Sequence, residues 1–193
     1  MPRSTNPLIV AADVSSPALA ADLAARLAGI VAMLKIGLEY FTAVGPDGVT
    51  RLRDQLPVFV DLKLHDIPTT VHRAARNLGR LGAAMLTVHA AGGEEMVRAA
   101  VEGSNEGADE VGRVPPAVVG VTVLSSLEEA GSVSPVWLAD RVMAAGAHGV
   151  VVSGRHVQEV RAALGPEALL VVPGIRASNE NHDDHARVLT PTE

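Results

Sequence analysis

Short apolar runs alternate with longer stretches rich in Ala, Leu and Arg along this chain. The runs lie at 8–12, 33–36, 58–62, 85–89, 117–121, 149–152 and 169–172. Stretches with helical character lie between them, at 17–28, 40–55, 69–81, 94–102, 135–145 and 157–164. Strict alternation of strand and helix is typical of a parallel sheet whose strands are joined by helical crossovers. The pattern therefore predicts an α/β fold.

The spacing of the repeats favours a barrel. One strand with its helix takes roughly 25–30 residues, close to the share of one unit in a TIM-type (β/α)8 barrel of about 250 residues. Seven strands are recognisable, so we expect a single domain over residues 1–193 that lacks the C-terminal unit of the barrel. A doubly wound open sheet is the alternative. Residues 103–116, which contain Gly, Glu and Pro, are expected to form an irregular loop before the fifth strand.

Composition excludes several classes of protein. The net charge is −6 and Lys and Arg form no runs, which argues against a nucleic-acid surface. The chain has no cysteine, so disulfides, thiolate catalysis and Cys-ligated zinc are ruled out. The N-terminal apolar run at 8–12 is too short for a signal sequence or a membrane span. We therefore expect a soluble, cytoplasmic protein with no membrane partner.

Charged residues stand at the ends of the expected strands, where parallel barrels build their active sites. They are Asp13, Lys35, Asp61, Lys63, Asp66, His89 and Arg176. The two-residue period of a strand places Asp61 and Lys63 on one face, and Leu62 and Leu64 on the other. We expect the leucines to face the helices and the charges to face the mouth of the barrel.

Alternating carboxylates and ammonium groups keep each other ionised. A protonated Lys63, lying between Asp61 and Asp66, is a poor nucleophile for a Schiff base. It is a good partner for a developing carbanion and then a proton donor. A carboxylate such as Asp61 beside a substrate carboxylate favours its loss as CO₂, with no cofactor or metal. A purely structural Asp–Lys pair is the alternative, but buried ions are costly to the fold.

Residues 60–70, Val-Asp-Leu-Lys-Leu-His-Asp-Ile-Pro-Thr-Thr, resemble the signature of the orotidine 5′-phosphate decarboxylase family. Further matches lie in family order at 12–13, 34–37, 88–93, 122–125 and 173–176. The resemblance implies conversion of orotidine 5′-phosphate to uridine 5′-phosphate and CO₂ in pyrimidine biosynthesis. It implies that Asp13 binds the ribose and Lys35 joins the charged array. Asp61 would face the leaving carboxylate, and Lys63 would protonate C6 of the pyrimidine.

The resemblance also implies a homodimer, in which Asp66 and Thr70 reach into the site of the neighbouring subunit. Ser125 stands where the family usually has a Thr near the pyrimidine, and Arg176 matches a substrate-binding Arg. His185 replaces a Gln that helps to close the phosphate end of the site. The Gly-Arg phosphate site of the family's eighth strand has no counterpart here.

Two other functions stay open at this point. Keto-sugar phosphate decarboxylases and hexulose phosphate synthases resemble this chain in sharing the Asp-x-Lys-x-x-Asp motif of residues 61–66. They bind Mg²⁺, however, and usually carry Glu in place of Lys35. The second alternative is that the chain is not an enzyme, but an inactive, truncated barrel fragment or a barrel half that binds a partner.

Overall fold

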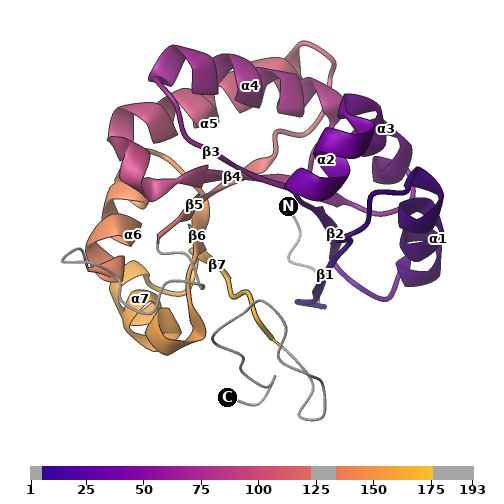
Figure 1. Ribbon diagram of the computed structural model, residues 1–193. Coiled ribbons are helices and arrows are strands. Elements are labelled where there is room, and N and C mark those ends of the chain that lie inside the picture. Colours follow the sequence, from indigo (N-terminus) through magenta and orange to yellow (C-terminus); the bar gives the residue numbers. More distant parts are fainter. Residues whose placement is uncertain (1–5, 123–133, 176–193) are drawn as a thin grey trace.

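The computed structural model describes residues 6–122 and 134–175. Seven parallel strands form one curled sheet, and each strand pairs with its neighbour in sequence, in the order β1 to β7 (Figure 1). The strands are β1 (Ile9–Ala11), β2 (Met33–Ile36), β3 (Val58–Leu64), β4 (Met85–His89), β5 (Ala117–Val121), β6 (Gly149–Val151) and β7 (Leu169–Val171). A doubly wound sheet would reverse its strand order at a switch point. The sequential order therefore confirms the barrel type and rules out the alternative.

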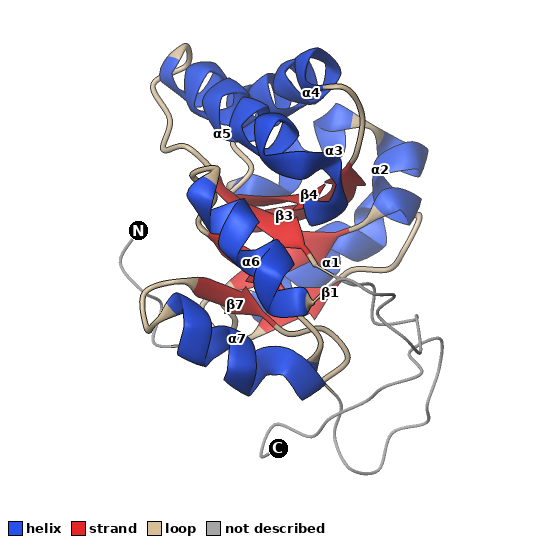
Figure 2. Cartoon of the chain, turned by 90° about the vertical axis from the view of Figure 1, so that its left-hand side faces the viewer, coloured by secondary structure: helices blue, strands red, loops and turns tan. Residues whose placement is uncertain are grey.

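Helices cover the outer side of this sheet (Figures 1 and 2). They are α1 (Pro17–Leu27), α2 (Leu38–Val44), α3 (Pro46–Arg53), α4 (Pro68–Leu81), α5 (Gly93–Asp109), α6 (Pro135–Ala144) and α7 (Val157–Leu164). Within residues 6–122 and 134–175, no helix combines the length and the hydropathy that crossing a bilayer requires.

The sheet separates two apolar layers, as the two-residue period of its strands requires. Val58 and Val60 of β3 belong to the large core between sheet and helices. Phe59, from the opposite face of the same strand, packs inside the curl with Met85 and Val119. This inner cluster fills the barrel below the ends of the strands. The side chains above it are the ones available for chemistry.

The segment expected to form one helix at 40–55 is two helices. Gly45 ends α2 with φ of +75°, a conformation that costs glycine little and other residues much. Pro46 then begins α3. The first N–H groups of a helix have no acceptor within the helix, so the lack of an N–H in proline costs no hydrogen bond at this position. The Gly-Pro pair therefore breaks the helix that the apolar pattern had joined.

The expectation of an irregular loop at 103–116 was wrong for its first half. Helix α5 continues to Asp109, although glycine is a poor helix former. Gly103 and Gly107 lie against the backbone carbonyls of His72 and Arg76 in α4, with no space for a Cβ between the two helices. Close packing of α4 on α5 therefore outweighs the low helix propensity of these glycines.

Candidate active site

Four charged side chains from three adjacent strands meet at the carboxyl ends of β1, β2 and β3. Lys35 Nζ lies 3.5 Å from Asp13 Oδ1 and 3.9 Å from Asp61 Oδ2. Lys63 Nζ donates a hydrogen bond of 2.9 Å to the same Asp61 Oδ2. The result is a continuous row of alternating charge, Asp13–Lys35–Asp61–Lys63. The sequence had predicted that these side chains converge, and the structure brings them together.

Exposure differs along this row. The Asp61 side chain is 14% exposed, against 66% for Asp13. A carboxylate that is largely removed from water needs paired cations to remain favourable. Among the described residues, two cations approach Asp61, because Lys35 and Lys63 both lie near its Oδ2 atom. It is therefore the electrostatic centre of the row.

The backbone of β3 is irregular where it carries these charges. Val60 pairs with Leu86 and Leu64 pairs with Val88, so the register shifts between the two pairs. Within the described residues, Lys63 is the one non-glycine residue with a positive φ, at 52°. Bulges and left-handed residues of this kind redirect side chains and are concentrated at functional sites. Leu62 and Leu64 still pack on the helix-side core, as expected.

Asp66 lies apart from this row. It is exposed, and its Oδ1 atom accepts a 2.7 Å hydrogen bond from the Ile67 backbone N–H just before α4. Among the described residues, the ion pair of Lys63 is with Asp61 and not with Asp66. Thr70 is also exposed, in the first turn of α4. Neither side chain meets the charged row within one subunit.

Two histidines border the site. The rings of His65 and His89 lie 5.2 Å apart, tilted by 43°. Burial lowers the pKa of His89, and the nearby His65 and Lys63 lower it further. The lowered pKa favours the neutral form of His89.

One residue of the site was missed by the sequence reasoning. Thr87 on β4 is 1% exposed, donates to Asp61 Oδ1 at 2.9 Å and accepts the Lys63 backbone N–H at 2.8 Å. It alternates with Met85 and His89 on the inner face of its strand. A polar residue at an inward position of an otherwise apolar strand was the available signal.

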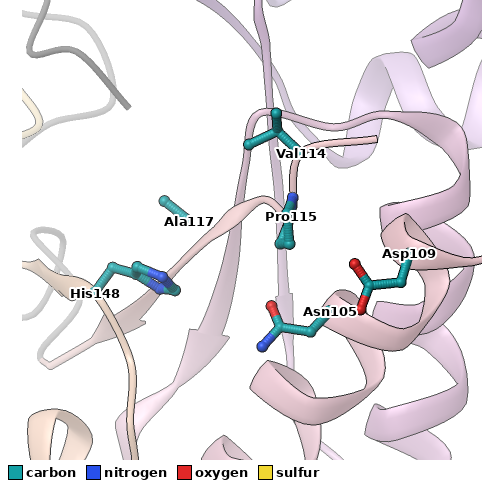
Figure 3. Close-up of a pocket in the computed structure, with 6 residues that line it drawn as sticks. All are labelled: Asn105, Asp109, Val114, Pro115, Ala117 and His148. Atoms are coloured by element: carbon teal, nitrogen blue, oxygen red, sulfur yellow. The ribbon is translucent and has the colours of Figure 1, made fainter. Parts of the chain in front are cut away.

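Three predicted substrate residues, Ser125, Arg176 and His185, lie outside the described residues. Within the described ranges, no three His, Asp or Glu side chains cluster as metal ligands would. A pocket of about 390 Å³ is lined by Asn105, Asp109, Val114, Pro115, Ala117 and His148 (Figure 3). These residues stand at the amino ends of β5 and β6 and on α5, so the pocket is at the opposite end of the strands from the charged row.

Known proteins resemble this chain in both sequence and structure. Orotidine 5′-phosphate decarboxylases from Paramagnetospirillum magneticum and Moorella thermoacetica are 48% and 42% identical to it. These matches cover 97% and 96% of this chain, and 85% and 79% of the respective relatives. The crystal structure of orotidine 5′-phosphate decarboxylase from Lactobacillus acidophilus has a TM-score of 0.79 at 33% identity, over 89% of this chain and 82% of that one. The family model named Orotidine 5′-phosphate decarboxylase / HUMPS family matches residues 6–193. This chain therefore belongs to the Orotidine 5′-phosphate decarboxylase / HUMPS family.

Proposed function

We propose that this protein decarboxylates orotidine 5′-phosphate to uridine 5′-phosphate. The observation that carries the proposal is the row Asp13–Lys35–Asp61–Lys63, with Lys63 Nζ 2.9 Å from Asp61. A relative that is 48% identical to this chain bears the name of this enzyme. We place the reaction in pyrimidine biosynthesis and in the cytoplasm.

Each charge in the row has a part in the reaction. Asp61 faces the substrate carboxylate, and the bond from C6 to that carboxylate breaks as neutral CO₂ departs. The electron pair stays on C6, where the ammonium of Lys63 first stabilises it and then donates a proton to it. A preorganised field of this kind acts without reorganisation during the reaction. Lys35 holds Asp61 and Asp13 in place, and Asp13 accepts hydrogen bonds from the ribose.

A metal ion has no assigned part in this mechanism, because two ammonium groups already supply positive charge beside Asp61. In the Mg²⁺-dependent sister enzymes, the resemblance implies a Glu in place of Lys35. We expect the substrate to make contacts with further residues that lie outside the described part of the chain. We assign these to Ser125, Arg176 and His185.

We further propose a homodimer in which Asp66 and Thr70 complete the site of the neighbour. Both side chains are exposed at the end of β3 and the start of α4, away from the row in their own subunit. Beside them, Ile67 is 66% exposed, an apolar side chain suited to burial against a second copy. Mixing inactive Lys63→Ala subunits with inactive Asp66→Ala subunits should restore activity, because each hybrid dimer contains one intact site. Mixed subunits that exchange but stay inactive would contradict the shared site.

The test of the reaction is a substrate panel with the purified protein. Orotidine 5′-phosphate should lose CO₂ at the same rate with and without Mg²⁺. Keto-sugar phosphates and the substrates of hexulose phosphate synthase serve as matched competitors, each assayed with added Mg²⁺. Turnover of one of these in preference to orotidine 5′-phosphate would assign the protein to a sister activity instead.

A further inference from the structure

We propose that Thr87 is a positioning residue that fixes both Asp61 and Lys63 for catalysis. This inference rests on the proposed function, since it concerns the two residues assigned to carboxylate loss and proton transfer. Thr87 comes from β4, the strand beside the one that carries both catalytic residues. Its hydroxyl makes one hydrogen bond to the side chain of Asp61 and one to the backbone of Lys63.

The hydrogen bond to Asp61 fixes the rotation of the carboxylate. Asp61 Oδ2 receives both lysines, at 2.9 Å from Lys63 Nζ and 3.9 Å from Lys35 Nζ. Asp61 Oδ1 accepts the Thr87 hydroxyl at 2.9 Å. The two oxygens therefore have different partners, one cationic and one neutral. In the part of the chain that the structure describes, loss of the hydroxyl leaves Oδ1 largely buried with no donor, and the carboxylate can turn away from the lysines.

The hydrogen bond from Lys63 fixes the backbone that carries the proton donor. The residue lies where the register between β3 and β4 shifts, so the regular pairing of the two strands is interrupted there. Its φ of 52° is sparsely populated by residues other than glycine and needs support from its surroundings. Thr87 Oγ1 accepts the N–H of this residue at 2.8 Å and supplies that support. The backbone conformation of Lys63 in turn sets the direction in which its side chain leaves the strand.

Simple packing does not account for a threonine at this position. The inner cluster directly below it consists of Phe59, Met85, Ala117 and Val119, all apolar. A valine would fill the same volume as Thr87 without burying a hydroxyl. Burial of a hydroxyl lowers stability unless the hydroxyl both donates and accepts a hydrogen bond. The buried Thr87 hydroxyl does both, because it donates to Asp61 Oδ1 and accepts from the Lys63 backbone N–H.

The experiment compares Thr87→Val, Thr87→Ser and a control, Ser104→Ala, with the wild type. Valine keeps the shape and removes both hydrogen bonds, whereas serine keeps the hydroxyl and removes a methyl group. Ser104 is equally buried, donates to the Val101 carbonyl within α5 at 3.0 Å and is remote from the charged row. The readouts are kcat and KM for orotidine 5′-phosphate, Tm, and the φ angle of Lys63 in a crystal structure of each variant.

For Thr87→Val we expect kcat to fall by about 10- to 100-fold, the factor that corresponds to one hydrogen bond with a charged group, while KM changes little. Thr87→Ser should recover most of kcat, and Ser104→Ala should keep it. In the valine variant, Lys63 should leave the left-handed region. The idea is overturned if Thr87→Val and Ser104→Ala have equal kcat, or if valine and serine impair kcat alike.

Failure of the proposed function can be distinguished from failure of the role proposed for Thr87. A wild type inactive on orotidine 5′-phosphate defeats the proposed function, and the φ angle of Lys63 in Thr87→Val then decides the positioning role by itself. If Thr87→Val does not fold, Thr87→Ser and Thr87→Cys replace it as a near-isosteric pair. Cysteine is only a weak donor and acceptor. Equal kcat in that pair would refute the role of the hydroxyl.

Discussion

Replacing Lys63 with alanine should abolish almost all decarboxylation. The change removes the proposed proton donor to C6 and the cation closest to Asp61, at 2.9 Å. Lys35 still lies 3.9 Å from Asp61, so the carboxylate keeps one positive partner. At an effective dielectric constant of about 20, the two attractions to Asp61 are at most about 6 kcal/mol for Lys63 and about 4 kcal/mol for Lys35. The remaining pair should therefore hold the carboxylate in place, and the losses arise at C6.

The size of the effect follows from two separate contributions. Loss of a positioned general acid costs about 10²- to 10⁴-fold in rate. Loss of one preorganised electrostatic group at the developing charge costs about 10²- to 10³-fold. Because the two act on the same transition state, we expect kcat/KM to fall by about 10⁴- to 10⁷-fold in Lys63→Ala.

The assay is the ultraviolet absorbance change as orotidine 5′-phosphate becomes uridine 5′-phosphate, with the Tm of each variant as a check on folding. Lys63→Arg is the matched control, because a guanidinium keeps the positive charge but does not release its proton. It should recover only the electrostatic contribution, about 10²- to 10³-fold. A Lys63→Ala protein with turnover within tenfold of the wild type would refute the assignment of Lys63 as proton donor.

Three further predictions concern metal dependence, pH and helix packing. Exhaustive chelation should leave decarboxylation unchanged, because the two active-site lysines supply the positive charge; activity that is lost and then restored by Mg²⁺ would contradict this. Burial lowers the pKa of His148 in the folded protein, so the unfolded chain binds its proton first as the pH falls. Stability should therefore decrease as the pH is lowered through about 6.5, measured as Tm, and less steeply in His148→Gln; an identical slope in both proteins would exclude this histidine as the cause. Gly107→Ala should lower the stability by about 1–3 kcal/mol or more in urea unfolding, because its Cβ would overlap the Arg76 carbonyl of α4. The exposed Glu102→Ala on the same helix should change stability by less than about 0.5 kcal/mol, and equal losses in the two variants would contradict the packing argument.

The sequence by itself determined the strand and helix order and therefore the parallel sheet. Alternation along β3 also predicted that Leu62 and Asp61 lie on opposite faces of the strand, and the structure confirms this, with Leu62 packed on the helix-side core and Asp61 bonded to Thr87 on the inner face. These inferences succeed because side-chain direction in a strand depends only on the two-residue period. The convergence of Asp13 and Lys35 on Asp61 was predictable for a similar reason, since parallel strands end at one edge.

Other features depend on contacts between segments far apart in the chain. Glycine propensity predicted that α5 would end near residue 102, but Gly103 and Gly107 are helical because α4 packs directly on their backbone. The left-handed φ of Lys63 could not be read from a strand pattern, because its hydrogen-bond partner is Thr87, 24 residues later on the next strand.

The position of Asp66 also depends on the tertiary structure and was not predicted from the sequence. Its spacing from Lys63 suggested that it flanks that lysine, whereas the end of β3 carries it outward to the start of α4. Local sequence determines which residues can share a strand face, because the period of a strand is fixed by backbone geometry. Only the tertiary structure determines which backbone irregularities persist and which side chains meet, because both depend on packing partners that local sequence does not contain.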